Sequence, residues 1–171
     1  MIILITGATH AGKTALAQKL MGKYGYPYLS IDHLKMGLIR SGNTPLTPLS
    51  SDEALTAYLW PIVREIIKTA IENKQNLIVE GCYIPFDWAQ DLSPEYKSQI
   101  RYYCLILSEQ YIEDHYDDIM AHANIIEARL DDSECTKAYL QREHGRFLQL
   151  ARQHQANYIL IEDTYEIPAD L

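Results

Sequence analysis

A glycine-rich stretch close to the N-terminus has the residue types and the spacing of a phosphate-binding loop. It follows an apolar run and reads Gly7, Ala8, Thr9, His10, Ala11, Gly12, Lys13 and Thr14. Glycines at its first and sixth positions let the backbone fold closely, so that successive N–H groups converge on one anion. A lysine in this place reaches the β- and γ-phosphates of a nucleotide, and the hydroxyl after it can bind Mg²⁺. We therefore expect all eight residues to bind ATP, with Lys13 at the phosphates and Thr14 on the metal.

One position inside the loop has no role in this pattern. His10 stands where the pattern accepts any residue. We expect its backbone to belong to the phosphate cradle and its ring to turn outward.

The residues on both sides of the loop predict the elements that hold it. Residues 2–5 are continuously apolar and read as a buried strand. Apolar residues then recur at helical spacing from Lys13 to about Lys23. Because the amino end of a helix carries a partial positive charge, this order places a favourable field at the phosphates.

The same alternation continues along the chain. Further strands are predicted at residues 28–31, 77–79, 102–107 and 158–161, and helices at residues 32–40 and 55–71. Strands that alternate with helices favour a parallel sheet covered by helices on both faces. Ser50 and Glu53 could form the capping box of the long helix, and Pro61 predicts either a kink or a restart within it.

Acidic side chains follow two of the predicted strands. Asp32 comes after the second strand and Glu80 after the third. Because parallel strands bring their carboxyl ends to one edge, both should lie near the loop. An acid on an apolar strand is unfavourable unless it is paired, which favours a functional role for Glu80. Asp32 has two interpretations, as a carboxylate that acts on a substrate or as the N-cap of the following helix.

Composition narrows the cellular context and the partners. The 171 residues are 47% hydrophobic and carry a net charge of −8, which disfavours a nucleic-acid partner. No apolar run approaches the length of a membrane span, so no membrane association is expected. The three cysteines have no metal-binding spacing and are expected to be reduced thiols of a cytoplasmic protein.

With these features the chain resembles the small P-loop kinases, which include adenylate kinase-like, shikimate and gluconate kinase-like, 2-phosphoglycerate kinase-like and zeta-toxin-like enzymes. The N-terminal loop, the strand ends at Asp32 and Glu80, and a polar segment after the fourth strand carry the resemblance. It implies a three-layer P-loop NTPase fold with a five-stranded parallel sheet in the order 2-3-1-4-5. It also implies one kinase-like domain over residues 1–171, with a lid-like segment at about 121–134.

The resemblance further implies catalytic roles. Such a kinase transfers the γ-phosphate of ATP, with Mg²⁺, to a small-molecule acceptor, here most simply a hydroxyl. Lys13 would neutralise the transferred group, and Asp32 would orient or deprotonate the acceptor. Arg129 is the single arginine of the lid-like segment and is the third catalytic candidate.

Acceptor binding is assigned in the same way. Arg40, Glu80 and Tyr83 are the candidates, with Arg64 a weaker one. Glu80 could also hold Mg²⁺ through water, beside Thr14. A solvated surface position remains an alternative for Arg40, and simple packing remains one for Tyr83.

The lid-like segment differs from that of nucleoside monophosphate kinases, which usually offer several arginines. Arg142 and Arg146 come later, opposite an apolar helical stripe, and read as a solvated face. This favours a neutral or singly charged hydroxyl acceptor. A nucleoside or nucleoside monophosphate kinase, and a nucleotide-binding regulatory or toxin-like module acting on a macromolecule, remain alternatives. Residues 163–165, after the last strand, fall where relatives often contact adenine.

Overall fold

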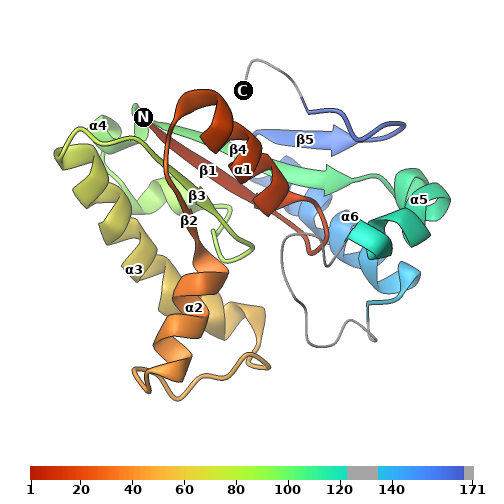
Figure 1. The fold of residues 1–171 in the computed structure, drawn as a ribbon, viewed down its shortest axis with the longest axis horizontal. Helices are drawn as coiled ribbons and strands as arrows, with labels where there is room; N and C mark the ends of the chain where they lie inside the picture. The colour runs from red at the N-terminus through yellow and green to blue at the C-terminus, as the bar shows by residue number, and fades with distance from the viewer. Residues whose placement is uncertain (123–134, 168–171) are drawn as a thin grey trace.

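A computed structural model describes residues 1–122 and 135–167 of the chain (Figure 1). One parallel sheet runs through it in the order β2-β3-β1-β4-β5. Its strands are β1 (Ile2–Gly7), β2 (Tyr28–Ser30), β3 (Leu77–Glu80), β4 (Ile100–Leu107) and β5 (Tyr158–Ile161). The predicted fold class and strand order are therefore confirmed.

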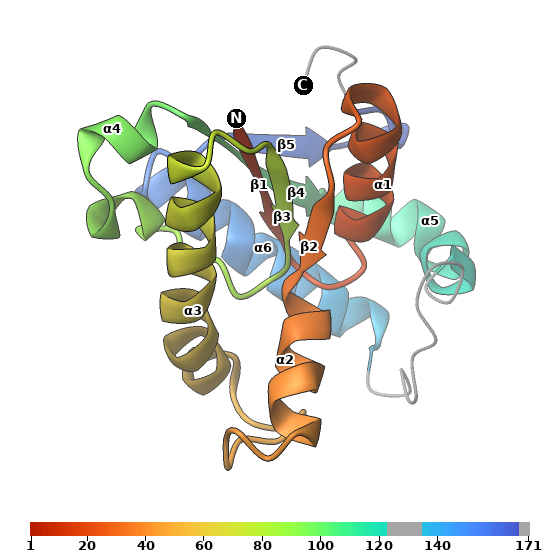
Figure 2. The same cartoon turned by 60° about the vertical axis from the view of Figure 1, so that its left-hand side comes forward.

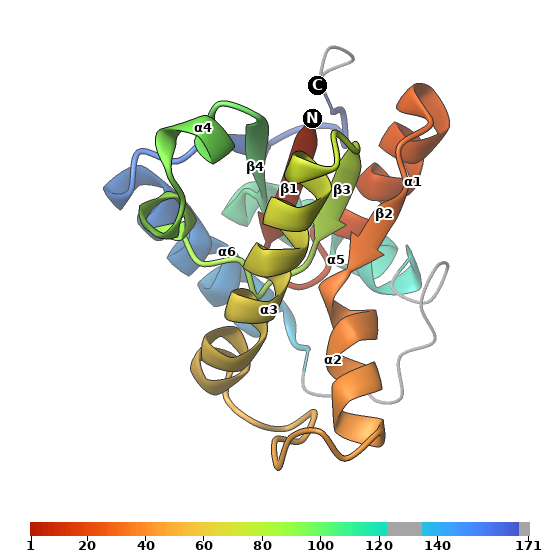
Figure 3. The same ribbon diagram turned by 90° about the vertical axis from the view of Figure 1, so that its left-hand side faces the viewer.

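Helices cover both faces of this sheet, as Figures 2 and 3 show. The helical elements are α1 (Lys13–Tyr24), α2 (Ile31–Arg40), α3 (Asp52–Glu72), η1 (Trp88–Asp91), α4 (Pro94–Lys97), α5 (Glu109–His122) and α6 (Lys137–Gln153). All six residues of β1 are buried, because successive side chains point to opposite faces and both faces are covered. Ile3 and Ile5 pack with α1, while Ile2 and Leu4 pack with α3 and α6.

Helix α2 begins one residue earlier than the sequence pattern predicts. Its N-cap is Ser30, and its first residue, Ile31, is fully buried in the core. Asp32 therefore lies inside the first turn, so the N-cap interpretation of Asp32 is wrong. Burial of Ile31 at the end of β2 decides where the helix starts, and this packing overrides the capping preference of aspartate.

Helix α3 is a single helix that continues through Pro61. Pro61 and Ala57 are both exposed, so water can reach the carbonyl that the proline leaves without its intrahelical donor. The restart alternative is therefore wrong. The predicted capping box of Ser50 and Glu53 is also wrong, because Ser51 is the N-cap and its hydroxyl accepts from the Ala54 N–H at 3.3 Å.

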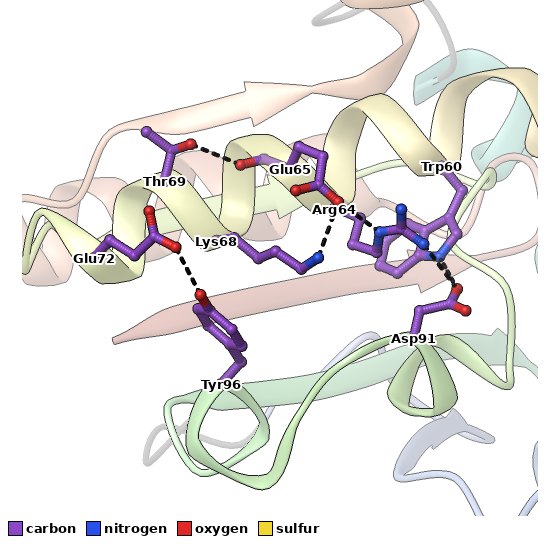
Figure 4. A network of polar contacts seen from close by, with 8 residues as sticks. All are labelled: Trp60, Arg64, Glu65, Lys68, Thr69, Glu72, Asp91 and Tyr96. Atoms are coloured by element: carbon purple, nitrogen blue, oxygen red, sulfur yellow. Dashed lines mark hydrogen bonds and ion pairs between the residues drawn. The ribbon is translucent and has the colours of Figure 1, made fainter.

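A polar network on the outer side of α3 fastens it to the segment between β3 and β4 (Figure 4). The Trp60 indole N–H donates to Asp91 at 2.9 Å, and Arg64 lies 3.8 Å from the same carboxylate. The Tyr96 hydroxyl donates to Glu72 at 2.6 Å. Arg64 is thus engaged in holding η1 against α3, which argues against the acceptor role considered for it above.

The end of β1 needs a glycine because β4 approaches it closely. A Cβ atom on Gly7 would lie 2.3 Å from the Leu105 carbonyl oxygen, and the φ angle of Gly7 is +144°. We expect Gly7→Ala to lower the free energy of unfolding by ~2 kcal/mol through this clash and backbone strain. Urea unfolding measures the effect.

Gly22→Ala is the matched control for that substitution. Gly22 lies inside α1 with no atom within 4 Å of an added Cβ, so alanine should stabilise the protein by up to about 1 kcal/mol. A Gly7→Ala protein as stable as the wild type would contradict the close approach of β1 and β4.

Candidate active site

The carboxyl ends of three adjacent strands bring the predicted residues to one edge of the sheet. β1 leads into the loop at residues 7–14, and β3 lies beside it with Ile5 opposite Glu80. β2 lies on the other side of β3 with Ser30 opposite Glu80, and Asp32 follows two residues later. The strand register therefore places the loop, Glu80 and Asp32 in the same neighbourhood.

The loop has the backbone conformation of an anion cradle. Gly12 adopts a left-handed conformation, with φ 80° and ψ 23°, immediately before the first residue of α1. The Leu16 N–H donates to the Gly12 carbonyl at 3.0 Å, which begins the helical ladder. The Lys13 ammonium donates to the Ala8 carbonyl at 2.9 Å, so its charge stays over the loop. The arrangement joins a partly buried helix N-terminus to a cation held beside it, as phosphate binding requires.

Tyr165, which follows β5, packs directly on this loop. Its hydroxyl donates to the Ala11 carbonyl at 2.9 Å. A Cβ atom on Gly12 would lie 1.9 Å from the same hydroxyl oxygen, so Gly12 is needed for this contact as well as for its backbone angles. Tyr165 is 40% exposed overall, but desolvation of its hydroxyl against the loop raises its pKa to about 12, so the phenol remains a donor at neutral pH. Tyr165 thus reaches the loop, while the adenine contact expected for residues 163–165 stays a prediction.

His10 has a left-handed backbone with φ 60°, which is uncommon for a residue other than glycine. Its Nδ1 atom lies 3.0 Å from the Thr9 hydroxyl and 3.5 Å from the Cys135 sulfur. The ring is therefore partly buried between the loop and the start of α6 and does not extend into open solvent.

A second histidine, which sequence reasoning missed, supports the loop from α6. His144 is 1% exposed, and its two ring nitrogens contact the loop and β4. Its Nδ1 accepts from the Leu107 N–H at 2.9 Å, and its Nε2 lies 3.0 Å from the Thr9 carbonyl. The only sequence signal was a histidine on the apolar face of α6, a pattern that also suits an ordinary core residue.

Lys35, which sequence reasoning also missed, joins Asp32 to Tyr83 on the side of the site that is expected to hold the acceptor. Lys35 donates to Asp32 and, at 2.9 Å, to the Tyr83 hydroxyl, and it lies 4.9 Å from the centre of the Tyr83 ring. Its side chain is only 12% exposed. Tyr83 is buried, and desolvation raises its phenol pKa above the ordinary value, so the hydroxyl stays protonated. The spacing of three residues between Asp32 and Lys35 on a predicted helix was the available signal.

The segment after β3 completes this side. Glu80 is 1% exposed, and a Cβ atom on Gly81 would lie 2.8 Å from the Ile31 Cβ, so β3 and α2 meet closely. Cys82 follows, and burial raises the pKa of its thiol to about 11 despite the opposing influence of Lys13. Cys82 is therefore a neutral, poorly nucleophilic group at neutral pH.

The donors available for Mg²⁺ fit a metal that is held mainly by substrate. Thr14 offers one hydroxyl in the first turn of α1, and Glu80 offers a buried carboxylate at the end of β3. Within residues 1–122 and 135–167, no three side chains of histidine, cysteine, aspartate or glutamate gather as a metal site. Such a donor set suits Mg²⁺, which commonly keeps phosphate oxygens and waters as ligands.

The remaining candidate arginines are less closely placed. Arg40 is exposed and is the last residue of α2, ~12 Å along the helix from Asp32. Arg146 is paired with Glu143 at 2.9 Å, and Arg142 lies 3.7 Å from the same residue, which agrees with a solvated face of α6. Arg129 and most of the lid-like segment lie outside the described residues.

A groove of about 890 Å³ lies at the opposite edge of the sheet. It is lined by residues 25–27, the middle of α3 and residues 74–77, which precede the amino ends of β2 and β3. Its volume alone would suggest a ligand site, but it contains none of the phosphate-binding residues. We place the site at the loop because the backbone and side-chain donors are there.

The buried imidazole of His144 predicts a pH dependence of stability. Burial lowers the pKa of His144 from 6.5 to about 4, with Lys13 and His10 adding smaller effects in the same direction. The unfolded chain therefore binds more protons between these values, and stability falls as the pH drops from about 6.5 towards 4. We expect the wild type to lose ~3 kcal/mol more than His144→Gln across this range.

Chemical denaturation at a series of pH values measures this difference. The carboxylates are common to both proteins, so their contribution cancels in the comparison. Parallel stability curves for the two proteins would show that His144 is not held neutral.

Comparisons with known proteins agree with the geometry. The shikimate kinase of Bacteroides thetaiotaomicron is similar in structure, with a TM-score of 0.57 and 17% identity over 98% of this chain and 89% of that one. A gluconokinase from Sinorhizobium meliloti is similar with a TM-score of 0.52 and 16% identity, over 96% of this chain and 83% of that one. A deoxyadenosine kinase from M. mycoides is similar with a TM-score of 0.54 and 13% identity, over 100% of this chain and 92% of that one. At these identities the likeness shows the P-loop kinase fold.

No curated protein matches the chain in sequence. In the described part of the chain, no helix is long and apolar enough to cross a membrane. A family model described as Zeta toxin matches residues 1–110, which include the loop, Asp32, Glu80 and Tyr83. The match covers well over half of the chain, and the protein belongs to the zeta-toxin family.

Proposed function

We propose that this protein transfers the γ-phosphate of ATP to a hydroxyl group of a small molecule. One observation carries the proposal: the phosphate loop with Lys13 shares its sheet edge with the group formed by Asp32, Lys35 and Tyr83. Phosphoryl transfer needs a cradle for the donor phosphates beside a group that handles the acceptor. A site for binding a nucleotide alone would have no use for the second part.

The residues divide the chemical work between the two substrates. Lys13 and the backbone N–H groups of the loop bind the phosphate chain and offset its charge. Mg²⁺, when bound to the nucleotide beside Thr14 and Glu80, supplies further neutralising charge. Asp32 accepts a hydrogen bond from the acceptor hydroxyl and takes its proton as the new phosphate bond forms. Lys35 holds the Asp32 carboxylate in one orientation through their ion pair.

The charge around Asp32 suits a neutral or singly charged acceptor. Among the described residues, Lys35 is the cation that bonds to Asp32, and the Tyr83 and Cys82 side chains beside it are neutral. Asp52 interacts electrostatically with Lys35 and adds a further carboxylate to this side. An anionic group on the acceptor could share the Lys35 ammonium, whereas a phosphate dianion would require more cations than this side provides. Arg40 and Arg129 remain proposals as additional ligands.

Two other functions remain to be distinguished. A nucleoside or nucleotide kinase is suggested by the likeness to a deoxyadenosine kinase, although the pairing of Arg142 and Arg146 with Glu143 gives it little support. A toxin-like module acting on a macromolecule is suggested by the family name, and the net charge of −8 disfavours RNA as its target. We propose a single cytoplasmic domain, with residues 121–134 as its lid, for whichever function applies.

Lys13→Ala is expected to lower acceptor-dependent ATP turnover at least a hundredfold, because Lys13 is the loop's cation. The experiment incubates the protein with MgATP and panels of sugars, polyols, hydroxy acids and nucleosides, and detects ADP and phosphorylated products. Stability should change by less than about 0.5 kcal/mol, since the amine bonds only to the Ala8 carbonyl among the described contacts. Full activity in this variant, or ATP binding without turnover on any panel, would contradict the proposal.

Asp32→Asn is expected to reduce kcat by about 10²–10⁴ while the Kd for MgATP changes less than about twofold. The amide keeps the shape of the side chain but cannot take a proton. Asp87→Asn is the control, because Asp87 is exposed and makes no side-chain cap bond. An equal fall in kcat for both variants, or an unchanged kcat in Asp32→Asn, would rule out the assigned role.

A further inference from the structure

The peptide that joins Thr9 to His10 has an orientation that matters for phosphate binding. A trans peptide is planar, so the Thr9 carbonyl and the His10 N–H point in opposite directions. The described chain contains no cis peptide. Because the Thr9 carbonyl points to His144 in α6, the His10 N–H points to the other side of the same plane. The His10 N–H therefore points away from α6, which is the direction required of an N–H group that donates to a phosphate inside the loop.

This peptide needs support from outside the loop. His10 has a φ of 60°, in a region that residues with a Cβ atom rarely adopt and that persists only when surrounding contacts hold it. A contact reaches this peptide from another part of the chain: His144, 135 residues along the sequence, contacts the Thr9 carbonyl. The conformation of the loop is therefore coupled to the position of α6.

The second contact of His144 determines which nitrogen carries the proton. The Leu107 N–H is a donor, so the His144 Nδ1 that faces it at 2.9 Å must be an acceptor. The proton of a neutral ring then lies on Nε2, which donates to the Thr9 carbonyl at 3.0 Å. Both ring nitrogens are thus satisfied, and the ring can neither flip nor gain a second proton without losing the Leu107 bond.

We propose that His144 is a positioning residue for the phosphates of the nucleotide. Through its Nε2–H it holds the Thr9–His10 peptide so that the His10 N–H is directed at the phosphate chain. The inference rests on the proposed nucleotide binding and adds a residue outside the loop motif that determines affinity. A histidine that served the core alone would influence stability and leave the preference for phosphates unchanged.

Two substitutions separate the two bonds of the imidazole. In His144→Gln the side-chain amide reaches the place of Nε2 and can still donate to Thr9. In His144→Asn the amide oxygen takes the place of Nδ1 and can still accept from Leu107, but the bond to Thr9 is lost. Each variant keeps one of the two buried bonds, so their melting temperatures should be similar, which makes them matched controls for each other.

Isothermal titration with MgATP, MgADP and adenosine tests the proposal. We expect His144→Gln to bind MgATP and MgADP within about threefold of the wild type and His144→Asn to bind them at least about tenfold more weakly. Adenosine has no phosphate, so its affinity should be the same in all three proteins. Unchanged MgADP affinity in a folded His144→Asn protein would overturn the proposal, as would an equal loss for adenosine.

The titration also separates this inference from the proposed function. Wild-type protein that bound neither MgATP nor MgADP would overturn both, whereas binding that Lys13→Ala abolishes and His144→Asn leaves intact would overturn only the role of His144. Long-range ¹H–¹⁵N spectra of the wild-type imidazoles add a test that needs no substitution. We expect a neutral Nε2–H ring for His144 at pH 7, and an Nδ1–H or doubly protonated ring would refute the proposal.

Discussion

A loop that turns its N–H groups inward must turn carbonyl groups outward, and those carbonyls need donors of their own. Within the described part of this protein, two side chains from outside the loop are placed to supply them. His144 is placed to donate to the Thr9 carbonyl, and Tyr165 donates to the Ala11 carbonyl. The inner surface of the loop can receive phosphate because its outer surface is already satisfied. The positions of α6 and of the segment after β5 follow from this requirement.

Much of this architecture could be predicted from the sequence because it depends on local patterns. Apolar runs located the five strands, and the spacing of Gly7, Gly12 and Lys13 located the loop. The start of α2 was predicted wrongly because the burial of Ile31 in the core determines where the helix begins. Local capping preferences take no account of such burial. His144 and Lys35 were missed for a related reason. Their partners lie 135 and 48 residues away, at Thr9 and Tyr83, so their roles exist only after folding.

The same reasoning explains how a protein of net charge −8 can offer a site to a polyanion. Charge at the surface is screened by solvent and salt, whereas Lys35 is mostly buried and Lys13 is fixed on the loop. Local cations and oriented N–H groups therefore dominate the field that a bound phosphate would experience. Tyr83 and Cys82 are kept neutral by burial, so they add no opposing charge near Asp32. Lys13 and the N–H groups of the loop can therefore bind a phosphate locally in a molecule that is acidic overall.

The family match ends at residue 110, whereas the two outward donors, His144 and Tyr165, lie beyond it. The matched part contains the phosphate loop and the group formed by Asp32, Lys35 and Tyr83. The remainder contains residues that hold the loop in shape, and they are attached to α6 and to the end of the sheet. A residue that acts only by supporting a carbonyl can be replaced by any donor that reaches the same place. Its identity is therefore less constrained than that of Lys13, which must carry charge to the phosphates. Within this fold, the residues that bind phosphate and the residues that hold the loop in shape thus lie in different parts of the chain.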